Sequence, residues 1–269
     1  MISLSIETLG LFALVGLLAG VVDAIAGGGG LVTVPALLLG GLDPVSAVAT
    51  NKLQGTIGTA AATARFAKAG MLEMRSRTLW LQAGLAFAGA VLGSALVSFA
   101  PVEAMRTGLP FLLVAVALYF AFGPALADLD GRARMTPLAF AVGVAAPIGV
   151  YDGVFGPGAG SFYMIGLVAL AGLGAVKAVA RTKLLNLSSN LAGLIVFILA
   201  GHVVWSAGLA MAAGTLVGAR LGAGLALKHG VRLVRPLVIV VALALSLRLM
   251  LDSGHPVGAL LRTMIAATP

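Results

Sequence analysis

Apolar segments, all but the short second and seventh of a length usual for membrane helices, follow one another along almost the whole chain. About ten of them, separated by short polar loops, cover residues 6–26, 31–39, 45–67, 79–99, 105–126, 137–150, 161–173, 176–200, 205–227 and 234–251. A membrane helix needs roughly 20 apolar residues. Because 60% of the residues are hydrophobic and only 10% are charged, no soluble domain fits between the segments. We therefore predict an all-α integral membrane protein that crosses a bacterial inner membrane several times.

The second half of the chain repeats the order of the first. Asp23 precedes a run of glycines, and Asp152 precedes another. Further along each half, a cluster of polar residues with a lysine, Lys52 or Lys183, interrupts an apolar segment. We predict a first transmembrane repeat at 1–127, a cytoplasmic connector at 128–135, a second repeat at 136–252 and a tail at 253–269. Five helical segments per half is an odd number, so the two repeats have inverted topology.

The positions of the basic residues predict the orientation. Basic residues of the loops 68–77, 132–134 and 228–235 fall on one side when ten crossings are drawn. Positive charge in short loops marks the cytoplasmic side. The N-terminus is then external.

The glycine-rich breaks are the candidate site. Each break precedes a short helical segment, and the free N–H groups and dipole of a helix N-terminus favour an anion. Two such breaks, one per half, are expected to converge on one substrate. The predicted substrate ligands are Gly27, Gly28, Gly29, Gly30, Thr33, Asn51, Lys52 and Gln54 in the first half, and Gly156, Gly158, Gly160, Ser161, Tyr163, Lys183, Asn186 and Asn190 in the second.

Structural alternatives stand beside each of these roles. The glycines also suit close packing of helices, and the amides suit hydrogen bonds between helices. The hydroxyls also suit bonds to their own helix backbone. Lys52 and Lys183 either supply positive charge to an anion or extend to the interface. Asp23 and Asp152 either carry a coupling proton or pair with a buried basic residue.

Composition argues against several other classes of function. The chain has no cysteine and three scattered histidines, so we expect no metal site and no cofactor. No GxxxxGK[ST] motif is present, which argues against direct use of ATP. The basic residues lie in loops between apolar segments, which argues against nucleic acid. The expected partners are a small anion and the lipid bilayer, and a homodimer is left open.

Four motifs in order resemble the TauE/SafE sulfite exporter family, above all its bacterial YfcA-like branch. They are the stretch from Asp23 to Gly30, ATNKLQG at 49–55, the repeat from Asp152 to Gly160, and GHVVW at 201–205 followed by Arg235-Pro236. The resemblance implies transport of sulfite or of an organosulfonate such as sulfoacetate. Because GPGAG at 156–160 departs from an uninterrupted glycine run, we expect two unequal half-sites.

These observations together predict a secondary transporter and not an enzyme. The expected activity is export of a small sulfur-containing anion by alternating access. An uptake permease or a channel for sulfonates or small carboxylates is the alternative. A membrane-embedded enzyme or assembly factor is a hypothesis from another class, but no nucleophile with a matching base is evident in the sequence.

Overall fold

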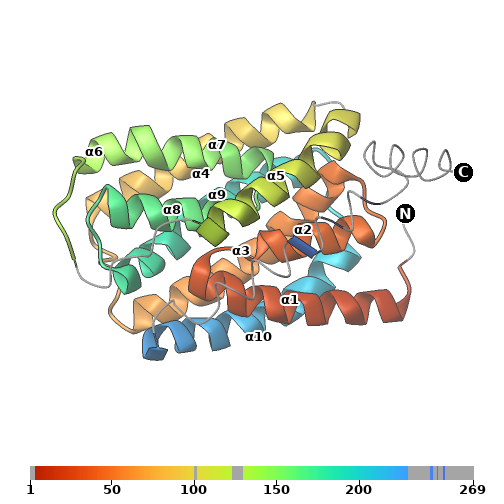
Figure 1. Ribbon diagram of the computed structural model, residues 1–269, viewed down its shortest axis with the longest axis horizontal. Helices are drawn as coiled ribbons and strands as arrows, with labels where there is room; N and C mark the ends of the chain where they lie inside the picture. The colour runs from red at the N-terminus through yellow and green to blue at the C-terminus, as the bar shows by residue number, and fades with distance from the viewer. Residues whose placement is uncertain are drawn as a thin grey trace, which may run out of the picture.

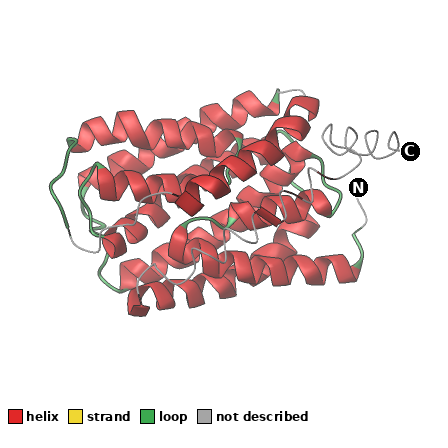
Figure 2. Ribbon diagram, viewed as in Figure 1, coloured by secondary structure: helices red, strands yellow, loops and turns green. Residues whose placement is uncertain are grey.

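The computed structural model describes residues 4–99, 102–122 and 130–229, with isolated positions at 243, 244, 247 and 251. Helices joined by short turns make up this part of the chain, and it contains no strand (Figure 2). The all-α prediction is therefore confirmed. The tail at 253–269, part of the connector at 128–135 and nearly all of the tenth apolar segment lie outside the described residues.

The first nine apolar segments correspond to helices, and a side-chain cap begins α1, α3, α4 and α6. The Asp43 side chain accepts hydrogen bonds from the N–H groups of Val45 and Ser46, and Pro44 occupies the first helical position of α3, where its missing N–H costs nothing. The helices are α1 (Ile6–Ala26), α2 (Gly30–Leu39), α3 (Pro44–Lys68), α4 (Arg77–Ser98), α5 (Val102–Phe122), α6 (Pro137–Phe140), α7 (Ala146–Val154), α8 (Ala159–Ala169), α9 (Ala175–Leu199) and α10 (Trp205–His229) (Figure 1).

The sixth segment continues further than predicted. A π-helical stretch, η1 (Ala141–Ala145), joins α6 to α7, so that one helical run extends from Pro137 to Val154. The predicted end at residue 150 is wrong, because Gly149 and Gly153 stay helical and pack against α4. A methyl group at Gly149 would lie 2.3 Å from the carbonyl oxygen of Ala86.

Two helices are too short to cross a bilayer alone. The 10 residues of α2 and the 11 of α8 each follow a glycine-rich break. At about 1.5 Å per residue, such helices reach about half of a hydrocarbon core about 30 Å thick. The predicted short, broken helices are thus present, one in each half of the chain.

Glycines allow the two halves to pack closely. A methyl group at Gly214 would lie 1.8 Å from the carbonyl oxygen of Ala13, and one at Gly218 would lie 2.0 Å from that of Leu17. These contacts advance in the same direction along both helices, so α1 and α10 are parallel neighbours. On the other side of the molecule, Gly89 and Gly93 of α4 make equally close contacts with α7.

Helices α3 and α9 form the centre between these two pairs. Gly55 of α3 lies against the Asn190 side chain, and Gly193 of α9 lies against the aliphatic part of Lys52. Residue numbers rise along one helix as they fall along the other, so α3 and α9 cross in antiparallel directions. Each also packs against one outer helix, α3 against α10 and α9 against α4.

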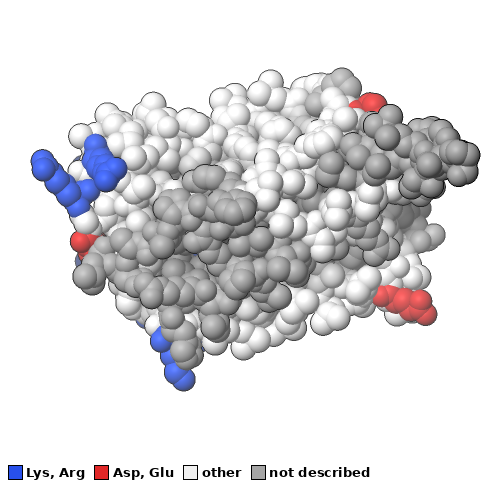
Figure 3. Space-filling view, in the orientation of Figure 1, with Lys and Arg blue, Asp and Glu red and all other residues white. Residues whose placement is uncertain are grey.

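The surface suits a bilayer. Five described helical runs are long and apolar enough to cross one: 6–25, 77–98, 137–154, 175–199 and 205–228. Large apolar side chains such as Leu92, Leu96 and Leu221 are exposed on them, as contact with lipid requires. On the face shown in Figure 3, basic side chains gather at the end where α6 begins, and the described middle is mostly uncharged.

Candidate functional site

The two glycine-rich breaks lie directly against each other. Gly27 ends α1 in the left-handed conformation, with φ of 78°, and its N–H donates to the carbonyl oxygen of Asp23 at 2.8 Å. In the second break, Gly156 and Gly158 have φ of 90° and 85°. A methyl group at Gly27 would lie 2.6 Å from the carbonyl carbon of Gly160, so both backbone conformation and contact require glycine there.

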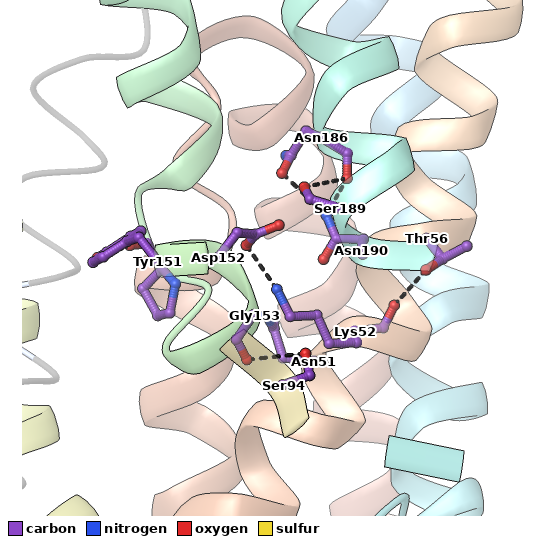
Figure 4. Close-up of polar contacts among 12 residues, drawn as sticks. Asn51, Lys52, Thr56, Ser94, Tyr151, Asp152, Gly153, Asn186, Ser189 and Asn190 are labelled. Atoms are coloured by element: carbon purple, nitrogen blue, oxygen red, sulfur yellow. Dashed lines mark hydrogen bonds and ion pairs between the residues drawn. The ribbon is translucent and has the colours of Figure 1, made fainter. Parts of the chain in front are cut away.

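Two ion pairs connect the halves. Lys52 Nζ of α3 donates to Asp152 Oδ1 of α7 at 2.7 Å, as Figure 4 shows. Lys183 Nζ of α9 lies 3.0 Å from Asp23 Oδ2 of α1 and also donates to the carbonyl oxygen of Asp23. Each lysine therefore pairs with the aspartate of the other half.

The burial of these pairs decides between the alternatives for the lysines. The side chains of Lys52 and Lys183 are 0% and 1% exposed. Extension to the interface is therefore wrong for both, because each ammonium group lies in the interior beside a carboxylate. For Asp23 and Asp152, the alternative of pairing with a buried basic residue is present in the structure.

Amides and hydroxyls surround the pairs. Asn51 Oδ1 accepts hydrogen bonds from Thr33 Oγ1 and Gln54 Nε2, both at 2.6 Å. The side-chain oxygen of Gln54, Oε1, in turn accepts a hydrogen bond from Thr215 Oγ1 at 2.9 Å. On α9, Asn190 Nδ2 donates to the backbone oxygen of Asn186 at 2.7 Å. These bonds hold the amide groups in fixed orientations.

A cavity of about 30 Å³ lies where these groups meet. One water molecule needs about 10–15 Å³ by the same measure, so the cavity has room for a very small ion or a few waters. Its walls come from both halves of the chain. The lining residues are Ala19, Gly20, Asp23, Gly27, Gly29, Gly30, Asn51, Gln54, Gly55, Gly58, Thr59, Asp152, Gly156, Gly158, Gly160, Asn186, Asn190, Thr215 and Ala219.

Most of the predicted ligands reach this cavity, but six do not. Gly28, Thr33, Lys52, Ser161, Tyr163 and Lys183 are not among the lining residues. The lysines lie behind the aspartates, and Thr33 lies behind Asn51. The Tyr163 hydroxyl donates to the carbonyl oxygen of Ala145 at 3.4 Å. Thr33, Lys52 and Lys183 therefore contact the lining side chains of Asn51, Asp152 and Asp23.

Thr59 and Thr215 also line the cavity, although neither was predicted as a ligand. Thr215 lies between Gly214 and Gly218, a spacing that indicates helix packing, and the packing is real. Its hydroxyl nevertheless binds Gln54 and lines the cavity. A hydroxyl inside a glycine stripe was the signal that could have identified it.

The two aspartates differ in their hydrogen bonds. Asp23 Oδ1 accepts from the N–H of Gly29 at 3.3 Å, and Oδ2 lies beside Lys183. Asp152 uses only Oδ1, toward Lys52, and among the described residues its Oδ2 has no hydrogen-bond partner. Asp152 is 1% exposed. In Figure 4 its free oxygen points toward α9, where Asn186 and Asn190 lie.

Comparison with known proteins gives a consistent result. The family model described as Sulfite exporter TauE/SafE matches residues 12–249. "Probable membrane transporter protein ORF9" of Sinorhizobium sp is 44% identical over 239 residues, which cover 89% of this chain and 91% of that protein. "Probable membrane transporter protein YfcA" of Escherichia coli K12 is 42% identical over 245 residues, covering 91% and 90%.

A relative from Haemophilus influenzae, also named "Probable membrane transporter protein", is 39% identical over 251 residues, covering 93% of this chain and 98% of that protein. No solved structure matches the chain significantly. The family match covers both glycine-rich breaks, both ion pairs and the whole cavity lining. The chain is therefore a membrane transporter of the TauE/SafE family.

Proposed function

We propose that this protein is a secondary transporter that exports a small sulfur-containing anion, sulfite or an organosulfonate such as sulfoacetate, across the bacterial inner membrane. The observation that carries the proposal is the cavity between the two glycine-rich breaks, which is lined by N–H-bearing backbone and by side-chain amides. The name of the matching family supports the choice of sulfite. An oxyanion needs several hydrogen-bond donors at once, and this lining can provide them.

Inverted repeats and alternating access belong to the same proposal. The antiparallel crossing of α3 and α9 supports them, as does the exchange of ion pairs between the halves. The pairing of α1 with α10 corresponds to the pairing of α7 with α4 when the two halves are interchanged. In transporters with inverted repeats, the substrate site lies at the interface of the repeats and one bundle rocks against the other.

The size of the cavity fits a closed state of such a cycle. A volume of about 30 Å³ admits a very small ion but is tight for sulfite and too small for sulfoacetate. Loading therefore requires the halves to separate around the glycine breaks. Those breaks contain left-handed glycines, the residue type that most readily tolerates a change of backbone torsions.

Solute counterflow in proteoliposomes tests this function. Vesicles loaded with unlabelled sulfite, sulfoacetate, thiosulfate or lactate receive the labelled form of the same anion outside. We expect transient accumulation of sulfite or a sulfonate, saturable and independent of ATP. Flux without counterflow would indicate a channel, and movement of lactate alone would favour a carboxylate permease.

A matched pair of variants ties the activity to the cavity. Asn190→Leu removes a lining amide and should abolish counterflow, whereas Gly84→Ala lies in open space outside the cavity and should retain it. Equal activity of the two variants would contradict the assignment of the site. Reversal of the imposed anion gradient then shows whether uptake is as efficient as export.

A further inference from the structure

We propose that Asp152, and not Asp23, carries a coupling proton on Oδ2, and that the resulting carboxylic acid binds the transported anion. The proposal rests on the proposed function and adds to it a coupling ion and its site. Its starting point is the free carboxylate oxygen of Asp152 in the wall of the cavity.

The two aspartates are not equivalent in this respect. Asp152 is almost fully buried, lines the cavity, and leaves Oδ2 without a donor among the described residues. A buried acceptor without a partner is unfavourable, so a ligand that supplies a hydrogen at this point is favoured. Asp23 has no such need, because Gly29 and Lys183 satisfy both of its oxygens.

An anion beside the ionised Asp152 would meet a carboxylate oxygen at short range. Like charges repel strongly in a dry interior, because little solvent screens them. Protonation removes the negative charge and changes Oδ2 from an acceptor into an O–H donor. The same proton therefore removes the repulsion and adds a hydrogen bond to the anion.

The charges balance through this step. Asp152 and Lys52 together carry no net charge while both are ionised. A proton from the aqueous phase bonds to Oδ2, and the pair becomes positive by one unit because Lys52 keeps its ammonium group. A monovalent anion restores neutrality. On the other side of the membrane the O–H bond breaks, the proton returns to water, and the anion leaves with it.

The titratable groups that interact with Asp152 are one lysine and two tyrosines. Lys52 from α3 is its ion-pair partner, Tyr163 from α8 and Tyr151 beside it on α7 lie near enough to interact electrostatically, and α4 has no titratable residue besides Arg77 at its first turn. Asp23 of α1 lines the same cavity and is paired with Lys183 of α9, which lies outside the lining. Tyr151 is occupied, since its hydroxyl donates to the Pro157 carbonyl oxygen at 2.6 Å.

Two isosteric variants separate the aspartates. Wild type, Asp152→Asn and Asp23→Asn are reconstituted with a pH-sensitive dye inside the vesicles, and methanesulfonate serves as the probe because it is monovalent and its charge does not change near neutral pH. In wild type we expect protons to move with the anion, and apparent affinity to rise as the pH falls, by up to about tenfold per pH unit. Any counterflow that remains in Asp152→Asn should no longer depend on pH or move protons, whereas in Asp23→Asn, whatever its transport rate, the remaining flux should still carry protons with the anion.

A second measurement does not depend on transport. Infrared difference spectra on acidification should show the C=O band of a buried carboxylic acid in wild type and in Asp23→Asn, but not in Asp152→Asn. A band that survives Asp152→Asn, or anion transport in wild type without proton movement, would overturn the proposal. Absence of counterflow with every anion in wild type would overturn the proposed function instead, and the infrared band would still decide the proton site.

Discussion

The charges of Lys52 and Asp152 are tolerated in the interior of the protein only because each lies beside the other. Both side chains are essentially unexposed, so each has lost the hydration that normally stabilises its charge. The attraction between two buried charges often only just offsets that loss. Such a pair adds little net stability compared with apolar residues, so stability alone does not account for its place beside the cavity.

Removal of one partner should therefore be much more harmful than removal of both. We expect Lys52→Met to lower the free energy of unfolding by about 3–5 kcal/mol, because Asp152 is left buried and unpaired. Lys52→Met combined with Asp152→Asn should recover most of that loss. Chemical unfolding in detergent micelles measures both values. A double variant no more stable than the single one would show that the charge of Asp152 is not the source of the loss.

The sequence identifies these residues but not their partners. A charge in an apolar segment is costly enough to predict a role for Asp23, Asp152, Lys52 and Lys183 without a structure. Which lysine meets which aspartate depends on how α3 and α9 cross, and that geometry is set by tertiary packing. The unpartnered Oδ2 of Asp152 is likewise invisible in the sequence, where each motif presents one aspartate before its glycines.

At the scale of helices, the contact between α1 and α10 depends on the absence of side chains. A methyl group at Gly218 would meet the backbone oxygen of Leu17, which cannot rotate away. We expect Gly218→Ala to separate the two helices and to lower stability by about 1–3 kcal/mol, in the range of overpacked cores.

Gly84→Ala is the matched control, because nothing lies within 4 Å of the added methyl group. It should leave stability unchanged or raise it by up to about 1 kcal/mol, since alanine favours a helix over glycine. Thermal unfolding in one detergent compares the two variants. Equal unfolding temperatures would show that the glycine stripe is not a packing surface.

The start of α9 is held by an exposed carboxylate. Asp130 Oδ1 accepts from the N–H of Gly174 at 2.7 Å, and Oδ2 pairs with Lys177. Hydrogen bonds from Lys177 and from the Gly174 N–H hold the pKa of Asp130 below its usual value. A lowered pKa in the folded state means that the ionised form stabilises the fold.

This contribution should therefore depend on pH in a defined direction. It is complete above about pH 4, where an unfolded aspartate is also ionised, and is lost as the pH falls through the lower pKa of the folded state. Asp130→Asn should be less stable than wild type at neutral pH and equal to it in acid. Unfolding temperatures of both proteins across this range test it. A difference that persists in acid would mean that the charge is not responsible.

Helix positions were more predictable than their details. Apolar periodic segments, Asp43 before Pro44 and the glycine breaks together locate most helix ends within a few residues. The π-helical stretch η1 was not predictable, because AVGVA at 141–145 has no local feature that distinguishes it from the α-helix around it. It packs against α4 in the fold.

For the whole molecule, the charge distribution predicts which end faces the cytoplasm. Exposed basic residues such as Arg75, Arg132 and Arg134 lie in the loop before α4 and before α6. Because the chain has no cysteine, single cysteines can be introduced and labelled cleanly. We expect a membrane-impermeant maleimide to label Ala200→Cys in intact cells but Arg75→Cys only after the membrane is opened. The reverse pattern would invert the proposed orientation.

The two buried ion pairs also have an electrical consequence. Asp23, Asp152, Lys52 and Lys183 sum to zero charge when all are ionised. Moving one net charge across a membrane potential of 100 mV involves about 2.3 kcal/mol. In the proposed cycle, each pair moves its positive and negative charges together, so this group does no net electrical work when the empty transporter reorients. A monovalent anion accompanied by one proton adds no net charge either. The transport rate of such a cycle would depend on the pH gradient and hardly at all on the membrane potential.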